Sequence, residues 1–233
     1  MKKFFIACLI GLSVMATDIT AAGDSVDLII NAAESGDAES QYFLAKLYGT
    51  GAGDLEKDKG KALYWLKKAS DAGNLDAQCE VAVYSLHGKE GHPADKAKAY
   101  AMLQENARQK HPASMREMGR LFDRGLAGFV TQDERQAFNW FLQAAEADDS
   151  LGAVYLGYYY EMGKGGVKQD YAKAMTWYQK GVSQLEPAAM NNIGVMYYYG
   201  KGVARDIKEA ERWWQMAVKF GSQDAQRNLD ALH

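Results

Sequence analysis

Five aspartates recur along the chain at nearly equal intervals. They are separated by 37, 38, 37 and 36 residues and lie at Asp58, Asp95, Asp133, Asp170 and Asp206. Carboxylates are common general acids and bases in enzymes. A catalytic centre needs one arrangement of such groups, however, and five equivalent carboxylates along the chain are typical of a repeating structural element. We therefore interpret these aspartates as helix caps and not as catalytic residues.

Other candidates for chemistry are few. The sequence contains no Gly-x-Gly-x-x-Gly string, P-loop, His-Glu-x-x-His, Gly-x-Ser-x-Gly or Ser-x-x-Lys motif. His87 and His92 are close in sequence and could share a metal ion, but no third ligand follows at helical spacing. The pair Asp148-Asp149 is expected to mark a turn between helices with a solvated cap. We predict no catalytic residue, no metal site and no cofactor.

A helix is expected before each aspartate. A small residue is followed after four positions by an apolar residue, after five by another small one, after eight by a mostly aromatic one and after eleven by glycine. These spacings share one face of a helix, and the glycine can take the left-handed conformation that ends it. The first small residues are Ser40, Ala77, Ser114, Gly152 and Ala189, and the glycines are Gly51, Gly88, Gly125, Gly163 and Gly200.

A second helix is expected after each aspartate, whose carboxylate can accept the unpaired amide protons of the first turn. Its predicted inner face has alanine at the fourth position, a large residue three later and a mostly small residue four after that. The large residues, expected to fill the space between neighbouring helix pairs, are Trp65, Met102, Trp140, Trp177 and Trp213. Because neither helix can bury its apolar stripe alone, the pairs must stack.

The order small-x-x-x-apolar-Gly-x-x-Tyr-x-x-Gly, followed by Lys-Ala-x-x-Trp-x-x-Lys-Ala, resembles the Sel1-like repeat, a longer relative of the tetratricopeptide repeat. The unit around Gly200–Asp206, with Ala210 and Trp213, carries the resemblance best. The second unit departs from it, because Ser85 and Met102 replace its aromatic residues. The resemblance implies an all-α, right-handed α-solenoid of about five helix-turn-helix repeats with capping half-repeats.

The same alignment gives the expected boundaries. The five repeats are expected over residues 37–73, 74–110, 111–148, 149–184 and 185–221. An N-terminal capping helix is expected over 24–36, with Leu28 and Ala32 at the large and small positions, and a C-terminal capping helix over 222–233. Terminal half-units of this kind cover the ends of a stack.

Residues 1–22 have the features of a secretory signal peptide. Lys2 and Lys3 precede an apolar stretch from Phe4 to Ala16, and cleavage is expected after Ala16 or Ala22. The stretch is too short to span a bilayer, so no stable membrane insertion is expected. A weak membrane anchor or a buried helix are the alternatives. We expect an exported protein of the bacterial periplasm, or a secreted one.

Cys79 is the one cysteine that remains once this signal is removed, so no intramolecular disulfide is expected. It could be a reactive thiol or an intermolecular tether, although a partly shielded, inert cysteine is the favoured interpretation. The formal net charge of −3 gives no sign of a nucleic-acid partner or of an anionic membrane partner.

The functional signal is expected where the repeats differ. Positions two, six and nine after the first small residue point away from the packed stripe, on the side that lines the concave surface of such solenoids. The candidate partner-binding residues are Tyr42, Arg116, Arg120, Tyr158, Glu161, Val195 and Tyr198. Tyrosine and arginine are enriched at binding hot spots. We expect Tyr160 and Tyr197 to be packing residues, whereas for Tyr158 and Tyr198 packing and binding both stay open.

These observations predict a non-catalytic, exported scaffold that binds a protein or peptide partner on its concave face. The alternatives are a periplasmic immunity protein that neutralises a secreted, phospholipase-type toxin, and a hydrolase that acts on cell-wall or β-lactam substrates. The resemblance to the Sel1-like repeat implies a role in envelope signalling, polysaccharide export, host interaction or toxin immunity, without choosing among them.

Overall fold

The computed structural model describes residues 19–232, and the elements named over this range are helices. The first helix of each pair, called an A helix here, is α2 (Ala38–Thr50), α4 (Leu75–His87), α6 (Pro112–Arg124), α8 (Ser150–Met162) or α10 (Pro187–Tyr199). The second, called a B helix, is α3 (Lys59–Asp71), α5 (Lys96–Arg108), α7 (Glu134–Glu146), α9 (Tyr171–Val182) or α11 (Ile207–Lys219). The terminal helices are α1 (Ile19–Glu34) and α12 (Gln223–Asp230).

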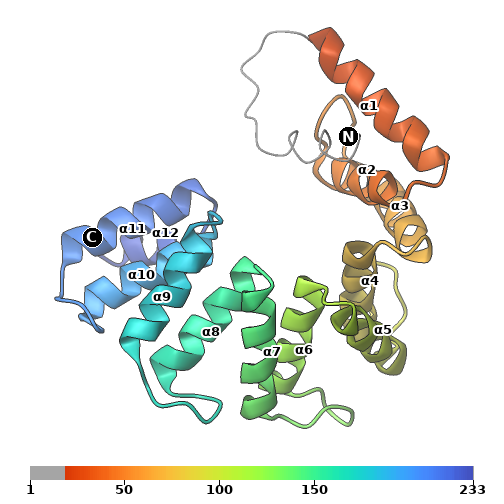
Figure 1. The fold of residues 1–233 in the computed structure, drawn as a ribbon. Coiled ribbons are helices and arrows are strands. Elements are labelled where there is room, and N and C mark those ends of the chain that lie inside the picture. The colour runs from red at the N-terminus through yellow and green to blue at the C-terminus, as the bar shows by residue number, and fades with distance from the viewer. Residues whose placement is uncertain (1–18, 233) are drawn as a thin grey trace. The chain divides into compact units, whose positions relative to one another are not determined.

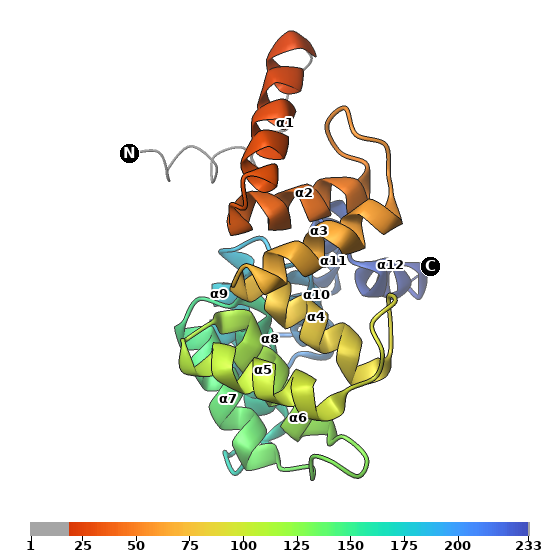
Figure 2. The same ribbon diagram turned by 90° about the vertical axis from the view of Figure 1, so that its right-hand side faces the viewer.

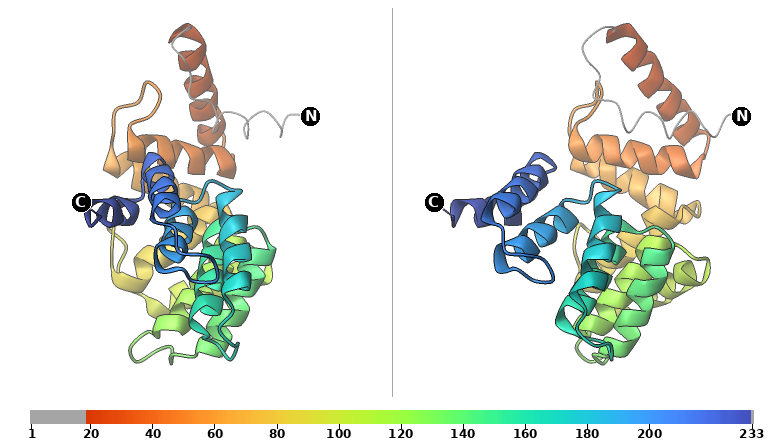
Figure 3. Two further views of the ribbon diagram at one scale, coloured as in Figure 1. Left: turned by 90° about the vertical axis from the view of Figure 1, so that its left-hand side faces the viewer. Right: turned by 60° about the vertical axis from the view of Figure 1, so that its left-hand side comes forward.

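The chain divides into two compact parts, residues 1–77 and residues 78–233. In the first part α1 packs on α2 and α2 packs on α3, and α1 crosses α2 at a wide angle (Figure 2). The helices of the second part follow one another as antiparallel pairs (Figure 1). Successive pairs are in contact, so that α7, α8 and α9 lie side by side (Figure 3).

The recurring aspartates begin the B helices. Each has a side-chain oxygen that accepts an amide proton from the first turn, as Asp170 does from the N–H of Lys173 at 2.9 Å. All five predicted caps, at residues 58, 95, 133, 170 and 206, are confirmed in this role. The glycines that follow the A helices have positive φ, as predicted, although Gly125 combines φ 70° with an extended ψ of 169°. Capping is a local requirement, which explains its regularity.

The B helices bury a different residue from the one predicted. Trp65, Trp140, Trp177 and Trp213 are only partly buried. The residues that follow the large position are buried throughout: Leu66, Leu103, Phe141, Tyr178 and Trp214. The reason is helical geometry, because positions four, eight and eleven after the aspartate form one stripe, and position seven lies on its flank. Trp177 does lie between repeats, since it packs against the core formed by α7 and α8.

The buried side chain of the B helix packs against a small residue of the A helix. This small residue lies five positions after the first small residue of the A helix. In the third to fifth repeats this residue is glycine, namely Gly119, Gly157 or Gly194, and the buried partner is aromatic. In the first two repeats it is Ala45 or Ala82, and the buried B-helix residue is Leu66 or Leu103. A glycine on the A helix therefore occurs with a large aromatic residue on the B helix, and an alanine occurs with a leucine. The two side chains vary together, so the space inside each repeat stays filled.

The terminal helices agree with the expected caps only in part. Leu28, predicted at a large core position, is 69% exposed, whereas Val26 and Ala33 on the same helix are buried. Ala225 of α12 is buried, and Leu229 packs against the same core as Trp214. Most of the predicted signal peptide lies outside the described residues, and Ala22 falls within α1. Its cleavage stays a prediction.

Candidate functional site

One ridge of each A helix runs beside the packed stripe, and its first position is buried in two of the helices, at Cys79 of α4 and Val154 of α8. It is formed by positions two, six and ten after the first small residue, which are spaced four apart and share one face. We call this surface on the third to fifth repeats the A ridge: Arg116, Arg120 and Arg124 of α6, Val154, Tyr158 and Met162 of α8, and Asn191, Val195 and Tyr199 of α10. Helix α8 contacts both α6 and α10, so the three segments are neighbours.

The exposed part of the ridge begins at position six. Tyr158 is 41% exposed, Met162 is 49% exposed and Tyr199 is 64% exposed. Arg124 is also exposed, and the described residues offer it no acidic partner. Position ten is absent from the sequence-based candidates. Its spacing of four from position six was the signal that could have revealed it.

Position nine, which the sequence analysis assigned to the concave surface, is instead used between helices. Glu161 is buried, and its carboxylate accepts the hydroxyl of Tyr178 at 2.7 Å and pairs with Lys201 Nζ at 2.7 Å. Tyr198 is partly buried and packs on Trp214, with ring centroids 5.5 Å apart. The assignment of Glu161 as a partner-binding residue is therefore wrong, and for Tyr198 packing dominates.

An acidic residue at position nine contacts a tyrosine and a lysine one repeat earlier as well. Asp123 at position nine of α6 accepts the hydroxyl of Tyr159 at 2.5 Å, and Lys164 Nζ lies 3.3 Å from it. Lys164 and Lys201 occupy the same place after their glycines, so the fourth and fifth repeats each place a lysine on the acid of the repeat before. Burial, followed by the hydrogen bond to the acid, raises the pKa of Tyr159 above its ordinary value, and burial with Glu161 does the same for Tyr178. Both phenols therefore stay protonated as donors.

The two predicted arginines are held by carboxylates beneath them. Arg116 Nη1 lies 2.6 Å from Asp149 Oδ2, and Arg120 Nη1 lies 2.8 Å from Glu117 Oε2. Burial acts to lower the pKa of Arg116, but the charges of Asp149 and Glu117 outweigh it and the pKa is raised. Glu117 and Asp149 are nearly inaccessible, while the Arg120 side chain keeps 34% of its surface exposed. Cations thus face outward and acids lie below.

Asp149 differs from its prediction in one respect. It caps α8 by accepting the N–H of Gly152, as expected, but it is not solvated, because Arg116 covers it. This contact joins the third repeat to the fourth. At the next junction the hydroxyl of Ser150 donates to Glu186, the cap of α10, at 3.1 Å.

The remaining candidates have varied surroundings. Val195 is partly buried beside the core of the last repeat. Lys164 Nζ lies 5.8 Å from the centroid of the Tyr158 ring, which places a cation beside the exposed tyrosine. Tyr42 belongs to residues 1–77, where Lys46 lies over its ring at 5.3 Å. Tyr160 and Tyr197 are packing residues, as predicted, because both contact buried clusters.

Cys79 is buried in the core of the second and third repeats, which supports the shielded, inert thiol over the reactive one. The ring of His92 packs near Tyr84, with centroids 5.7 Å apart. The described residues contain no group of three His, Cys, Asp or Glu side chains arranged to hold a metal ion. They also contain no helix long and apolar enough to cross a membrane.

The repeated pattern of caps, glycines and paired side chains corresponds to a known family model. The Sel1 repeat model matches residues 38–74, 75–111, 112–149, 150–184 and 187–219. The chain belongs to the Sel1 repeat family. The predicted all-α solenoid of Sel1-like repeats is thereby confirmed, and Sel1 repeats are in general protein-interaction scaffolds.

Similar proteins extend over most of the chain. Chitin synthase regulatory factor 3 of Schizosaccharomyces pombe is 25% identical over 204 residues, which cover 85% of this chain and 22% of that protein. The Sel1-repeat-containing protein YjcO of Escherichia coli K12 is 28% identical over 223 residues, covering 91% of this chain and 93% of that protein. The crystal structure of a Sel1 repeat protein from Oxalobacter formigenes is 26% identical, with a TM-score of 0.68 over 90% of this chain and 89% of that chain.

Proposed function

We propose that this chain is a non-catalytic, exported scaffold that binds a protein or peptide partner along the A ridge. The observation that supports it is a contrast between neighbouring rows of the A helices. Position nine is committed to contacts within the stack, whereas positions six and ten present Arg120, Arg124, Tyr158, Met162 and Tyr199 to solvent. Sel1 repeats in general bind proteins, which agrees with this use of the surface.

The chemistry of the ridge suits a protein surface. Its α8 and α10 segments supply two tyrosine rings and a methionine, which bury large area at a low entropic cost. Its α6 segment supplies arginines, and Arg120 is fixed by Glu117 below it. Aromatic residues, methionine and arginine are the side chains most enriched in protein interfaces. A partner with an apolar centre flanked by carboxylates would match both segments.

Export is the second element of the proposal. It is supported by Lys2 and Lys3 before the apolar stretch from Phe4 to Ala16, residues that lie outside the described part of the chain. A periplasmic location would place the partner in the bacterial envelope. Detection of the processed protein in a periplasmic fraction tests this element separately.

Binding by the A ridge is tested with two double-alanine variants. One removes a pair of exposed side chains from the ridge, and the other removes a matched exposed pair elsewhere. The double substitution Tyr158→Ala with Tyr199→Ala should reduce capture of the envelope partner at least about tenfold, the effect of losing about 1.4 kcal/mol at a hot spot. Met216→Ala with Phe220→Ala is the control, because Met216 of α11 and Phe220 directly after it are exposed by 40% and 45%. Equal capture by both double variants would remove the A ridge as the binding surface.

A further inference from the structure

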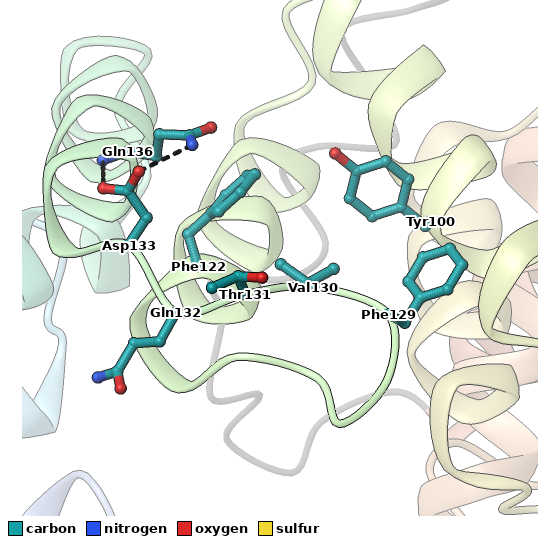
Figure 4. Close-up of a pocket in the computed structure, with 8 residues that line it drawn as sticks. All are labelled: Tyr100, Phe122, Phe129, Val130, Thr131, Gln132, Asp133 and Gln136. Carbon is teal, nitrogen blue, oxygen red and sulfur yellow. Dashed lines mark hydrogen bonds between the residues drawn. The ribbon is translucent and has the colours of Figure 1, made fainter.

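A hollow of about 340 Å³ lies between α5 and the segment that follows α6 (Figure 4). Its apolar side is formed by Tyr100, Phe122, Phe129 and Val130, and its polar side by Thr131, Gln132, Asp133 and Gln136. None of these residues belongs to the A ridge. The hollow is therefore a separate feature of the third repeat.

The hollow exists because the connecting segment is one residue longer than in the next repeat. Asp133 follows Gly125 after eight positions, whereas Asp170 follows Gly163 after seven. The extra length is closed by a short bridge in which Leu126 and Val130 exchange backbone hydrogen bonds of 2.8 and 2.9 Å. Phe129 stands at the end of this bridge and is 45% exposed. Lys96 Nζ donates to the carbonyl of Ala127 at 3.0 Å and ties the segment to α5.

The next repeat shows what fills the corresponding space. Phe138 and Tyr160 occupy the positions of Tyr100 and Phe122, and their rings meet edge to face with centroids 5.7 Å apart. The shorter segment closes directly on Phe138, since a Cβ atom at Gly165 would lie 2.7 Å from Phe138 Cβ. In the third repeat Tyr100 instead meets Phe129 edge to face at 5.6 Å. Phe122 therefore faces the hollow (Figure 4). It lacks the aromatic contact that Tyr160 makes with Phe138 in the next repeat.

The polar side of the hollow presents acceptors. Asp133 Oδ1 accepts the backbone N–H groups of Arg135 and Gln136, and Oδ2 accepts Gln136 Nε2 at 2.9 Å. Gln136 uses one of its two Nε2 hydrogens on Asp133, and its carbonyl oxygen can accept a hydrogen bond from a ligand. Asp133 is the one charged residue among the eight that line the hollow. A ligand carboxylate would be repelled there, and a hydroxyl donor would be complementary.

We propose that this hollow binds the side chain of a tyrosine from a partner protein. The phenol ring lies against Phe122 and Tyr100, where the next repeat has its own aromatic pair, and the hydroxyl donates toward Asp133 and Gln136. Size is no obstacle, because a cavity of roughly 150 Å³ is enough to hold a benzene ring. The proposal rests on the proposed function in that the partner is a protein, but it uses a different surface.

The probe is N-acetyl-tyrosinamide, titrated into the full chain and followed by NMR. It should bind with a dissociation constant in the region of about 1 mM, as expected for a ligand of this size. N-acetyl-phenylalaninamide should bind several-fold more weakly, because it lacks the hydroxyl. Methyl glucoside, a probe for a sugar site, should not bind.

Two variants and one control locate the binding. Phe129→Ala should weaken tyrosinamide binding at least tenfold, and Gln136→Leu should remove the preference for tyrosinamide over phenylalaninamide. Phe220→Ala, a substitution of an equally exposed phenylalanine directly after α11, should leave both affinities unchanged. Thermal unfolding of each variant verifies that the fold is retained.

The proposal is overturned if tyrosinamide does not bind, if phenylalaninamide binds equally well to the unsubstituted chain, or if Phe129→Ala leaves binding intact. Tighter binding of methyl glucoside would also overturn it and identify a sugar site. The Tyr158→Ala/Tyr199→Ala variant should still bind tyrosinamide normally. Failure of the A ridge and failure of this pocket can therefore be told apart.

Discussion

The ring of Phe141 occupies the space that a side chain at residue 119 would need. A Cβ atom at Gly119 would lie 2.6 Å from both Cδ1 and Cε1 of that ring, well inside van der Waals contact. Gly157 has the same relation to Tyr178, and Gly194 to Trp214. The glycine of the A helix and the aromatic residue of the B helix are thus a single packing unit.

This pairing predicts strong coupling in a double-mutant cycle. Gly119→Ala should lower the free energy of unfolding by about 1–2 kcal/mol, because overpacking costs about 1–3 kcal/mol and alanine regains up to about 1 kcal/mol of helix propensity. Combination with Phe141→Leu should recover at least about 1 kcal/mol relative to the sum of the single changes. The pair Ala82 and Leu103 of the second repeat is the natural precedent. Additive losses in urea unfolding would contradict the pairing.

Burial predicts an order of stability losses in the fourth repeat. Tyr178 is fully buried, Trp177 is partly buried and Tyr158 is exposed. Tyr178→Ala should therefore cost about 3–5 kcal/mol, Trp177→Ala roughly half as much and Tyr158→Ala less than about 1 kcal/mol. Urea titrations of the three variants measure the order. A greater loss of unfolding free energy for Trp177→Ala than for Tyr178→Ala would show that the tryptophan is the core residue.

Alkaline pH should destabilise the protein through Tyr159 and Tyr178. Both have a folded-state pKa raised above the ordinary value of about 10, first by burial and then by their acidic partners. A raised pKa favours the protonated folded state, so this stabilisation is complete below about pH 10 and is lost as the pH rises further. Tyrosinate absorbance should show a cooperative step that coincides with unfolding. The step should shrink in Tyr159→Phe/Tyr178→Phe, and its persistence there would assign it to other tyrosines.

Lys201 should matter more than a lysine in a surface ion pair. Its hydrogen bond with Glu161 raises the pKa of Lys201, and its loss would leave a buried carboxylate with one fewer donor. Lys201→Met should cost about 1–3 kcal/mol at neutral pH. Lys173→Met is the control, because Lys173 Nζ lies 3.8 Å from Asp170 Oδ2 in an exposed pair that contributes about 0–1 kcal/mol. Equal losses in thermal unfolding would show that Glu161 is satisfied without Lys201.

The helices and their caps could be predicted from the sequence because they depend on short-range geometry. An aspartate before a helix accepts protons from its own first turn, and a glycine at its end needs only a positive φ. The predicted interaction face was less accurate. Glu161 is polar and is therefore predicted on the surface, but its partners are Tyr178 of α9 and Lys201 of the segment after α10. Such contacts leave no local signal.

Side-chain size was also misleading. The sequence predicts Trp177 as the core residue because its side chain is the largest, yet one residue corresponds to about 100° of helix rotation, and Tyr178 faces the stripe. The longer segment before Asp133 was visible as the 38-residue interval, but its hollow depends on the direction of the Tyr100 ring. The immunity and hydrolase alternatives, and the export of the chain, stay predictions.

The polar contacts between successive repeats make the order of the repeats specific. Arg116 meets Asp149, Asp123 meets Tyr159 and Lys164, and Glu161 meets Lys201, each across a junction with the following repeat. Apolar faces of similar shape would accept almost any neighbour, whereas these junctions leave a buried charge unmatched when the wrong repeats adjoin. Internal duplication can therefore lengthen such a chain smoothly only when a copied repeat brings its neighbour's partner residues with it.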